Sequence, residues 1–225
     1  FKFINICMDD RHSFWMFSFL KKYNRGSSGL ISVLDGALVT AKEVVNWYHL
    51  NGTPAKYFPE ATSQDFYFKD FNAKKKFDVG FVGANYGLRG EYIQYLIDKG
   101  VDVKAYGNGW PSGRIDMDNV NRFMNECRMI IGFGYILGCK DLFALKLRDF
   151  DVPATGTFYL TTENKDLYEL FPEKEGCYFK TKEELLSRVE YYLEFDQERE
   201  GVAAESLRNI CGNHLYSQRL MEVLQ

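Results

Sequence analysis

Cysteine is scarce in this sequence, with five residues among 225. The number is odd and no two cysteines form a C-x-x-C pair, so the spacing of a metal site is missing and a disulfide framework is not expected. We interpret the cysteines as free thiols that pack as small apolar side chains. This interpretation places the protein in a reducing compartment, the cytoplasm. The five are Cys7, Cys127, Cys139, Cys177 and Cys211.

Long apolar runs and an excess of one charge are also missing. No segment approaches the roughly 20 apolar residues that cross a bilayer, and "FKFINICM" is too short for a signal peptide because Asp9 and Asp10 follow it. The chain begins at Phe1 inside a predicted strand, so we expect that the start of the protein is missing. The formal net charge of −3 provides no broad positive field for nucleic acid or an anionic membrane. An anionic ligand would therefore need a local group of cations.

The sequence does contain a regular alternation of strand-like and helix-like segments. Residues 1–8 resemble a buried strand, and 54–68 show little periodicity, as expected of a crossing segment. The polar run 69–76 marks a domain boundary, which gives domains of residues 1–67 and 68–225. Later strands are predicted within 77–84, 101–107, 128–134, 157–162 and 176–180. Helices between successive strands predict an α/β fold with a parallel sheet, and such sheets bind ligands at the carboxyl ends of their strands.

The turn after the strand at 77–84 is rich in glycine. Gly83, Gly87 and Gly90 do not form a clean G-x-G-x-x-G, and no acidic residue follows at the expected distance. Small residues would let a ligand approach the backbone, and helix amides attract phosphate. Arg89 adds positive charge to the first helical turn. A plain tight turn explains the same glycines, so both interpretations stay open.

The stretch "LKLRDFDVPATGTFYLTTEN" (145–164) crowds charges onto a predicted helix, interrupted by Pro153, in front of a strand. Lys146 and Arg148 could compensate the two negative charges of a diphosphate. Asp151 is a short acceptor suited to the hydroxyl groups of a sugar. A cluster of surface salt bridges is the alternative on spacing alone.

Three segments together closely resemble the C-terminal domain of group-1 glycosyltransferases, and most closely the spore-protein CgeB-like branch, whose motif reads roughly K-x-R-x-F-E-V-P-x-x-G. The segments are "DVGFVGANYGLRGEYIQYLIDKGVDVKAYGNGW", "LKLRDFDVPATGTFYLTTENKDLYELF" and "EELLSRVEYYLEFDQERE". The similarity covers about residues 77–220 in the same order. It implies the GT-B fold, in which two Rossmann-like domains face each other across a cleft and the C-terminal domain binds most of the nucleotide-sugar donor. The helix at 214–225 would then cross back to the N-terminal domain.

The resemblance also implies roles for individual residues. Lys146 and Arg148 would face the donor phosphates, and Asp151 would hold the ribose in place of the longer Glu that is usual there. Phe143 stands where related retaining families carry the first Glu of an E-x7-E motif, so that motif is incomplete. The glycine-rich loop of the donor domain would comprise Gly83, Asn85, Tyr86 and Arg89.

Residues 1–67 would be the last part of the N-terminal, acceptor-side domain. Many relatives carry a catalytic His in the loop after the strand that matches 1–8. Asp9 and Asp10 occupy that loop here, with His12 close behind. A carboxylate at this place could act as a base toward an acceptor hydroxyl or could orient the acceptor. Helix capping is the structural alternative.

Our first hypothesis is a glycosyltransferase that moves a sugar from a nucleotide-diphosphate sugar to an acceptor hydroxyl on a glycan, lipid or protein. The second is a non-catalytic protein that keeps the GT-B fold and binds sugar nucleotides or takes part in glycan assembly. A Rossmann-type oxidoreductase is the third, and the missing G-x-G-x-x-G argues against it. We expect no cofactor and no divalent metal, because no Asp/His cluster with ligand spacing occurs in the donor domain.

Overall fold

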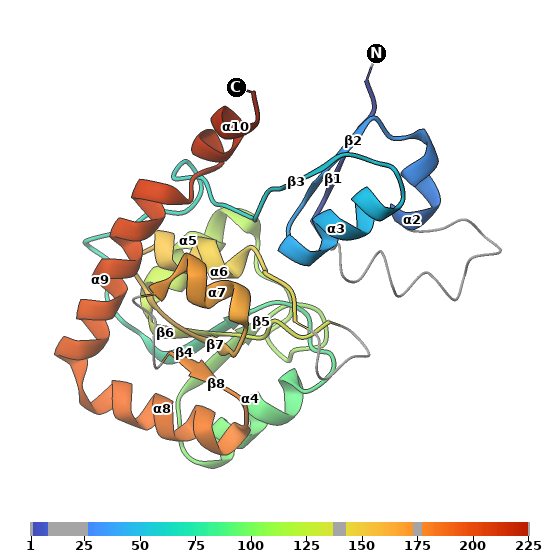
Figure 1. Ribbon diagram of the computed structural model, residues 1–225. Helices are drawn as coiled ribbons and strands as arrows, with labels where there is room; N and C mark the ends of the chain where they lie inside the picture. The colour runs from blue at the N-terminus through green and yellow to red at the C-terminus, as the bar shows by residue number, and fades with distance from the viewer. Residues whose placement is uncertain (1, 9–26, 137–142, 173–176, 225) are drawn as a thin grey trace. The chain divides into compact units, whose positions relative to one another are not determined.

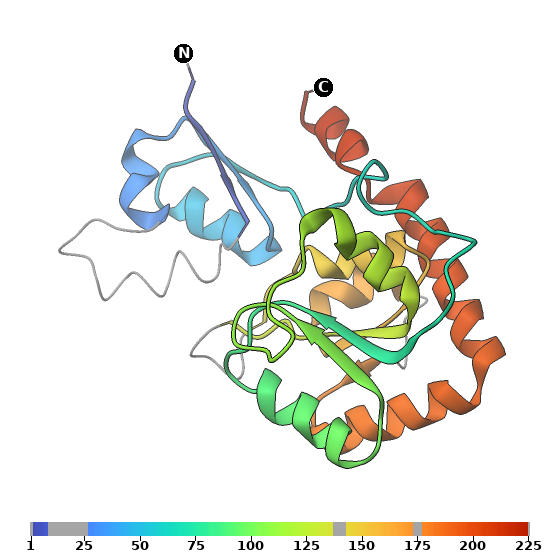
Figure 2. The ribbon, with the colours of Figure 1, turned by 180° about the vertical axis from the view of Figure 1, so that it is seen from behind.

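The computed structural model describes residues 2–8, 27–136, 143–172 and 177–224. The chain folds into two compact units (Figures 1 and 2). Unit 1 comprises Phe1–Glu60 and Tyr135–Leu145, and unit 2 comprises Ala61–Gly134 and Lys146–Gln225. Each unit contains a parallel β-sheet flanked by helices, which confirms the predicted α/β class. No helix within the described ranges is long and apolar enough to cross a membrane.

Unit 1 contains a parallel sheet in the order β1-β2-β3. Its core forms where Val39 of the central strand meets Val44 and Tyr48 of α3, all three fully buried. Val44 and Tyr48 are four residues apart, which is the spacing of one helical face, and this apolar spacing favours a helix here. The elements are β1 (Ile4–Cys7), α2 (Ser27–Leu30), η2 (Ile31–Val33), β2 (Gly36–Val39), α3 (Lys42–Leu50) and β3 (Ala55–Tyr57).

One sequence prediction for unit 1 is wrong, and one segment has more structure than its sequence indicates. The first strand was expected to be buried, but β1 is an edge strand, and Ile4 and Ile6, which share one face of it, are 58% and 54% exposed. The crossing segment, which the sequence marks only by its low periodicity, contributes β3. The amide of Ala37 donates to the Pro54 carbonyl, and the amide of Phe58 donates to the Val39 carbonyl. Pairing of this kind is non-local, so a local sequence pattern does not reveal it.

Unit 2 contains a five-stranded parallel sheet in the order β5-β4-β6-β7-β8. Helices α5 and α6 cover one face, and α4 and α8 cover the other (Figures 1 and 2). The first elements are β4 (Phe77–Val82), α4 (Arg89–Asp98), β5 (Val103–Tyr106), α5 (Met117–Glu126) and β6 (Cys127–Gly132). They are followed by α6 (Arg148–Ala154), β7 (Phe158–Thr162), α7 (Lys165–Leu170), β8 (Tyr178–Phe179), α8 (Lys182–Glu194), α9 (Asp196–Asn213) and α10 (Tyr216–Leu224).

The two faces of this sheet bury different kinds of side chain. On the α5 and α6 face the core is mostly aliphatic and sulfur-containing, and it consists of Val120, Phe123, Met124, Cys127, Ile130, Val152 and Tyr159. On the α4 face, Phe133 packs edge-on against Phe81, Tyr92 and Phe179, at centroid distances of 5.6, 5.8 and 5.8 Å. Such edge-to-face contacts fix ring orientations, so the carboxyl end of β4 and the segment after β6 are held in place.

The helix expected around Pro153 is shorter than the sequence indicated. It begins at Arg148 and ends at Ala154, with Pro153 inside its last turn. The carboxylate of Asp149 accepts a hydrogen bond of 2.8 Å from the amide of Lys146, three residues earlier. This contact satisfies an amide at the start of the helix, which explains why α6 begins where it does.

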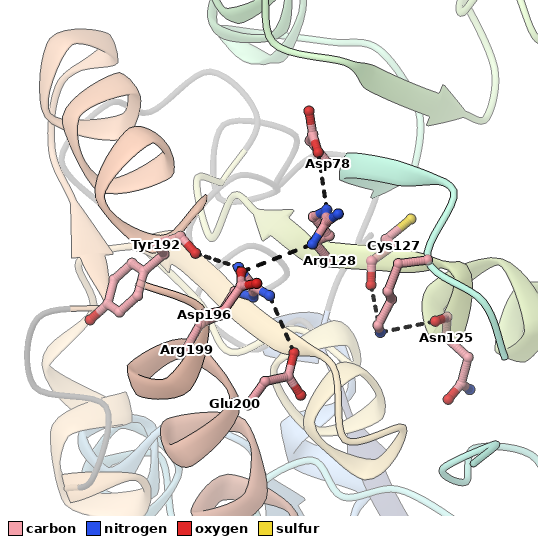
Figure 3. Close-up of polar contacts among 9 residues, drawn as sticks. Asp78, Asn125, Cys127, Arg128, Tyr192, Asp196, Arg199 and Glu200 are labelled. Atoms are coloured by element: carbon pink, nitrogen blue, oxygen red, sulfur yellow. Dashed lines mark hydrogen bonds and ion pairs between the residues drawn. The ribbon is translucent and has the colours of Figure 1, made fainter. Parts of the chain in front are cut away.

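A group of charged residues fastens α8 and α9 to the amino-terminal edge of the same sheet (Figure 3). The Arg128 guanidinium lies 3.3 Å from the Asp78 carboxylate and 3.9 Å from that of Asp196. Arg199 is 2% exposed, donates to the Tyr192 carbonyl, and pairs with Asp196 and Glu200. Both arginines at this edge therefore have carboxylate partners.

We expect Arg199→Met to lower the free energy of unfolding by about 1–3 kcal/mol, because the buried Tyr192 carbonyl loses a charged donor. Urea unfolding of the variant and the wild type measures the difference. Arg122→Met is the matched control, since that side chain is 69% exposed and its ion pair with Glu126 should contribute less than about 1 kcal/mol. Equal losses in the two variants would contradict a special role for the buried arginine.

Candidate functional site

The strand order of unit 2 reverses between β4 and β6. The chain passes from β4 to β5 on one side and then continues from β6 on the other side. In open parallel sheets, ligands bind in the crevice at the carboxyl ends of the two strands that flank such a reversal. Gly83 follows β4 at this place, and Phe133 follows β6. The glycine-rich turn predicted from the sequence therefore stands at the expected ligand position.

Gly83 and Gly107 let two loops approach closely. Gly83 has φ +151° and Gly107 has φ +138°, so both adopt backbone conformations that L side chains rarely take. A Cβ atom on Gly107 would lie 2.2 Å from the Gly83 carbonyl oxygen, and the Trp110 indole donates to that same oxygen at 2.7 Å. Gly107 is thus required by the packing of the loop after β4 against the loop after β5, and Gly83 by its backbone conformation.

Asn85 and Tyr86 shape the same loop from within. The Asn85 amide donates to the Asn108 carbonyl at 2.7 Å, and its side chain donates to the Gly109 carbonyl at 3.3 Å. The Tyr86 ring lies under the Arg89 guanidinium, with 3.8 Å between the ring centroid and Cζ. Asn85 therefore joins the two loops, and Tyr86 supports a cation.

Arg89 is buried at the carboxyl end of β4, with 4% of its surface exposed. Its guanidinium donates to the carbonyls of Ala84 at 2.9 Å and Phe133 at 3.5 Å. Burial, and then the positive charge of Arg148, lower the pKa of Arg89 to about 10. Two cations therefore lie close enough to repel each other.

Arg148 reaches the same place from α6. Its Nη1 donates to the Val82 carbonyl at 3.0 Å, and its Cζ lies 5.3 Å from the centroid of the Phe81 ring. Its Nε and Nη2 atoms are buried and have no hydrogen-bond partner in the described part of the chain. Within those same residues, neither Arg148 nor Arg89 forms an ion pair with a carboxylate. The site thus combines two positive charges with N–H donors of Arg148 that have no hydrogen-bond partner among the described residues.

Lys146 and Asp149 lie at the start of α6 beside Arg148. Asp149 is 1% exposed and binds the Lys146 amide through Oδ2 and the Tyr159 hydroxyl through Oδ1, at 2.8 Å each. The Lys146 side chain is half-buried. The structure therefore brings Lys146, Arg148, Arg89 and the Gly83 loop to one edge of one sheet.

Asp151 is buried one turn further along α6, with 7% of its surface exposed. The Thr62 hydroxyl donates to its Oδ1 at 2.7 Å. Burial raises the pKa of the Asp151 carboxyl to about 7, while the Thr62 hydrogen bond and the charge of Arg148 act in the opposite direction. Sequence analysis did not anticipate Thr62, because 89 residues separate it from its partner.

Asp9, Asp10 and His12, which the sequence places near an acceptor, lie outside the described residues. No group of three potential metal ligands is found among the residues that the structure describes. Sequence analysis also missed Trp110 and Tyr159; the "GNGW" turn gave a weak signal for the first, and nothing local pointed to the second.

A family model described as "Glycosyl transferase-like" matches residues 90–225, which is 136 of the 225 residues. The chain belongs to this family. A search of curated proteins finds no match. The family assignment confirms the resemblance to glycosyltransferases at its general level.

Solved structures with GT-B architecture resemble this glycosyl transferase-like chain at low sequence identity, which shows the fold. Sucrose-phosphate synthase from Thermosynechococcus elongatus has a TM-score of 0.67 at 10% identity, over 99% of this chain and 66% of the other. HepE from Anabaena, in complex with UDP and glucose, has a TM-score of 0.74 at 10% identity, over 98% and 70%. BGT of phage T4, in complex with UDP and Mn²⁺, has a TM-score of 0.61 at 17% identity, over 97% and 71%. The chain thus spans about two thirds of the length of these structures.

The raised pKa of Asp151 predicts a pH-dependent stability. Its pKa is about 7 in the folded chain, whereas an ordinary aspartate carboxyl has a pKa of 3.8. This carboxyl therefore favours folding fully below pH 3.8, and that contribution is lost as the pH rises through 7. Asp151→Asn removes the titration. We expect the stability of the variant, relative to wild type, to increase by roughly 2–3 kcal/mol between about pH 5 and pH 8.

Urea unfolding at both pH values measures this change. Asp118→Asn, at an exposed position in α5, is the control for the loss of one carboxylate. A constant difference between Asp151→Asn and wild type across this range would show that Asp151 titrates near its ordinary pKa.

Proposed function

We propose that the chain is part of a nucleotide-sugar-dependent glycosyltransferase whose donor site is the arginine pair of unit 2. The observation that supports this most strongly is the meeting of Arg89 and Arg148 at the strand reversal, where no described carboxylate pairs with either. Buried like charges are unfavourable, so an anionic ligand would stabilise both. Residues 68–225 would bind the donor, and residues 1–67 would lie on the acceptor side.

The orientation of Arg148 supports a phosphate as the ligand. Its Nη1 is used by the Val82 carbonyl, which leaves the edge formed by Nε and Nη2. The two N–H groups on that edge are parallel, a geometry that matches two oxygens of one phosphate. Arg89 and Lys146 belong to the same sheet edge, so a second phosphate would also meet positive charge. Structures such as HepE contain UDP, a molecule with this diphosphate.

Asp151 is our candidate for ribose recognition. It stands three residues after Arg148 on α6, at the position of the usual Glu of the family motif. An ionised carboxylate can accept hydrogen bonds from two vicinal hydroxyls. We place the chain in the CgeB-like branch because "KLRDFDVPATG" matches its motif apart from this Asp.

Catalysis would involve the acceptor side. We propose that Asp9 or Asp10 acts as a base toward the acceptor hydroxyl, or orients it, with His12 nearby. The acceptor hydroxyl would belong to a glycan, a lipid or a protein. Transfer assays with Asp9→Asn and Asp10→Asn test this assignment, and full activity in both variants would remove these residues from the mechanism.

A non-catalytic sugar-nucleotide-binding protein is the second candidate. It is favoured by Phe143, which stands at the first position of the E-x7-E motif and packs on Tyr135 at a centroid distance of 4.9 Å. An aromatic ring there cannot replace a carboxylate. Slow hydrolysis of UDP-sugars by the purified chain would favour the enzyme, whereas binding without turnover would favour this alternative.

We expect Arg148→Ala to weaken the binding of UDP by about 1.5–3 kcal/mol, because a charge-assisted hydrogen bond to phosphate is lost. Isothermal calorimetry with UDP and GDP measures the affinity. Arg128→Ala is the matched control, since this arginine lies at the opposite edge of the sheet and pairs with Asp78. The proposed donor site is wrong if a folded Arg148→Ala protein binds both nucleotides like the wild type.

The same titration tests whether a divalent metal is needed. We propose that the guanidinium groups supply the positive charge, so UDP affinity in EDTA should equal that in Mn²⁺ within about twofold. BGT of phage T4 has been solved with UDP and Mn²⁺, which makes manganese the right ion to test. Binding that appears only when Mn²⁺ is added would refute the metal-free site.

A comparison of UDP with pyrophosphate isolates the ribose contact. Asp151→Asn keeps the shape of the side chain but removes its charge, so we expect weaker UDP binding and unchanged pyrophosphate binding. Arg148→Ala should weaken both, and Asp151→Glu should retain UDP because Glu is the usual residue. If Asp151→Asn is less stable yet binds UDP normally, Asp151 serves only as the partner of Thr62.

A further inference from the structure

The Tyr159 side chain lies on the face of the unit 2 sheet that α5 and α6 cover, and its ring is directed toward the carboxyl end of β6. It pairs with Ile130 in the β6–β7 register, yet its ring extends over Gly132, two residues nearer the carboxyl end of β6. A Cβ atom on Gly132 would lie 1.8 Å from the Tyr159 hydroxyl oxygen and 2.5 Å from Cζ. Only glycine at position 132 leaves room for this ring, so the hydroxyl reaches the level at which α6 begins.

The Tyr159 hydroxyl contacts the Asp149 carboxylate, which lies in the first turn of α6. Tyr159 donates to Asp149 Oδ1 at 2.8 Å, and Asp149 Oδ2 accepts from the Lys146 amide at 2.8 Å. Tyr159 is 3% exposed and Asp149 is 1% exposed. In a buried setting both hydrogen bonds are strong, and loss of either removes one partner from a buried polar group.

We propose that Tyr159 and Asp149 are positioning residues that aim the Arg148 fork at the donor phosphate. Asp149 belongs to the same helical turn as Arg148, and its carboxylate holds the amide of Lys146, two residues before Arg148. We call the contacts from Tyr159 to Asp149 and from Asp149 to the Lys146 amide the brace. Without the brace, Arg148 would keep its charge but lose the fixed backbone from which it reaches Val82. The inference rests on the proposed donor site, and it concerns residues to which sequence analysis gave no role.

A double-mutant cycle tests the coupling. We expect Tyr159→Phe to weaken UDP binding about 3- to 10-fold, and the same substitution in an Arg148→Ala background to weaken it by less than about twofold. Tyr192→Phe is the matched control: it also removes a buried tyrosine hydroxyl, one that faces Cys177, and should leave UDP affinity unchanged. A purely structural Tyr159 would lower the melting temperature and weaken UDP binding equally in both backgrounds, which would overturn the proposal.

Amide hydrogen exchange without ligand provides a separate measurement of the brace. Tyr159→Phe and Asp149→Asn should each speed exchange at the amides of residues 146–150, and Tyr192→Phe should not. Unchanged exchange in both variants would refute the brace, even if UDP binds well. If the wild-type chain binds no UDP, the proposed donor site fails, and the positioning role fails with it whatever the exchange shows.

Discussion

Two guanidinium groups meet at the carboxyl end of β4, one from the buried Arg89 and one from the partly buried Arg148, and both contact backbone carbonyls and aromatic rings. Arg89 donates to the carbonyls of Ala84 and Phe133, and Arg148 donates to that of Val82. The Phe81 ring lies 5.5 and 5.3 Å from their respective Cζ atoms. These partners orient the cations but carry no negative charge. These partners therefore do not offset the repulsion between the two cations, and a bound anion would reduce it.

The opposite edge of the same sheet shows that this fold readily supplies carboxylates to its arginines. There Arg128 pairs with Asp78, and Arg199 pairs with Asp196 and Glu200. Both edges belong to unit 2, so its overall content of acidic residues does not explain why, in the described part of the chain, the arginines at one edge pair with carboxylates and those at the other do not. An edge whose arginines are paired serves stability, whereas an edge whose arginines meet no carboxylate among the described residues is suited to binding.

Local patterns in the sequence were sufficient to predict much of this arrangement. The alternation of strands and helices indicated the parallel sheet, and the glycines and cations at 83–89 and 146–148 do lie at the carboxyl edge of that sheet. What escaped prediction depends on contacts between distant segments. The pairing of β3 with β2, the exposure of Ile4 and the bond from Thr62 to Asp151 are examples. The residues that adjoin these features in the sequence give no signal for any of them.

Tyr159 illustrates the same limit within the site. The buried strand β7 predicts only that Tyr159 is buried, and its hydroxyl contacts Asp149 because Gly132 on a neighbouring strand leaves space for the ring. The contact requires Tyr159 on β7, Asp149 on α6 and Gly132 on β6 together, and each of these residues alone has an ordinary structural explanation.

The charges in the proposed site also link its phosphate and ribose contacts. Burial already raises the pKa of Asp151 to about 7, and a diphosphate held by Arg148 would offset the positive charge that opposes this rise. An ionised Asp151 beside bound phosphate therefore needs further donors besides Thr62, and the two hydroxyls of a ribose are such donors. A ligand that offers a diphosphate without hydroxyls would leave Asp151 protonated. A nucleotide sugar would satisfy the cations and the carboxylate together, which is why Arg148 and Asp151 on α6 point to the same class of ligand.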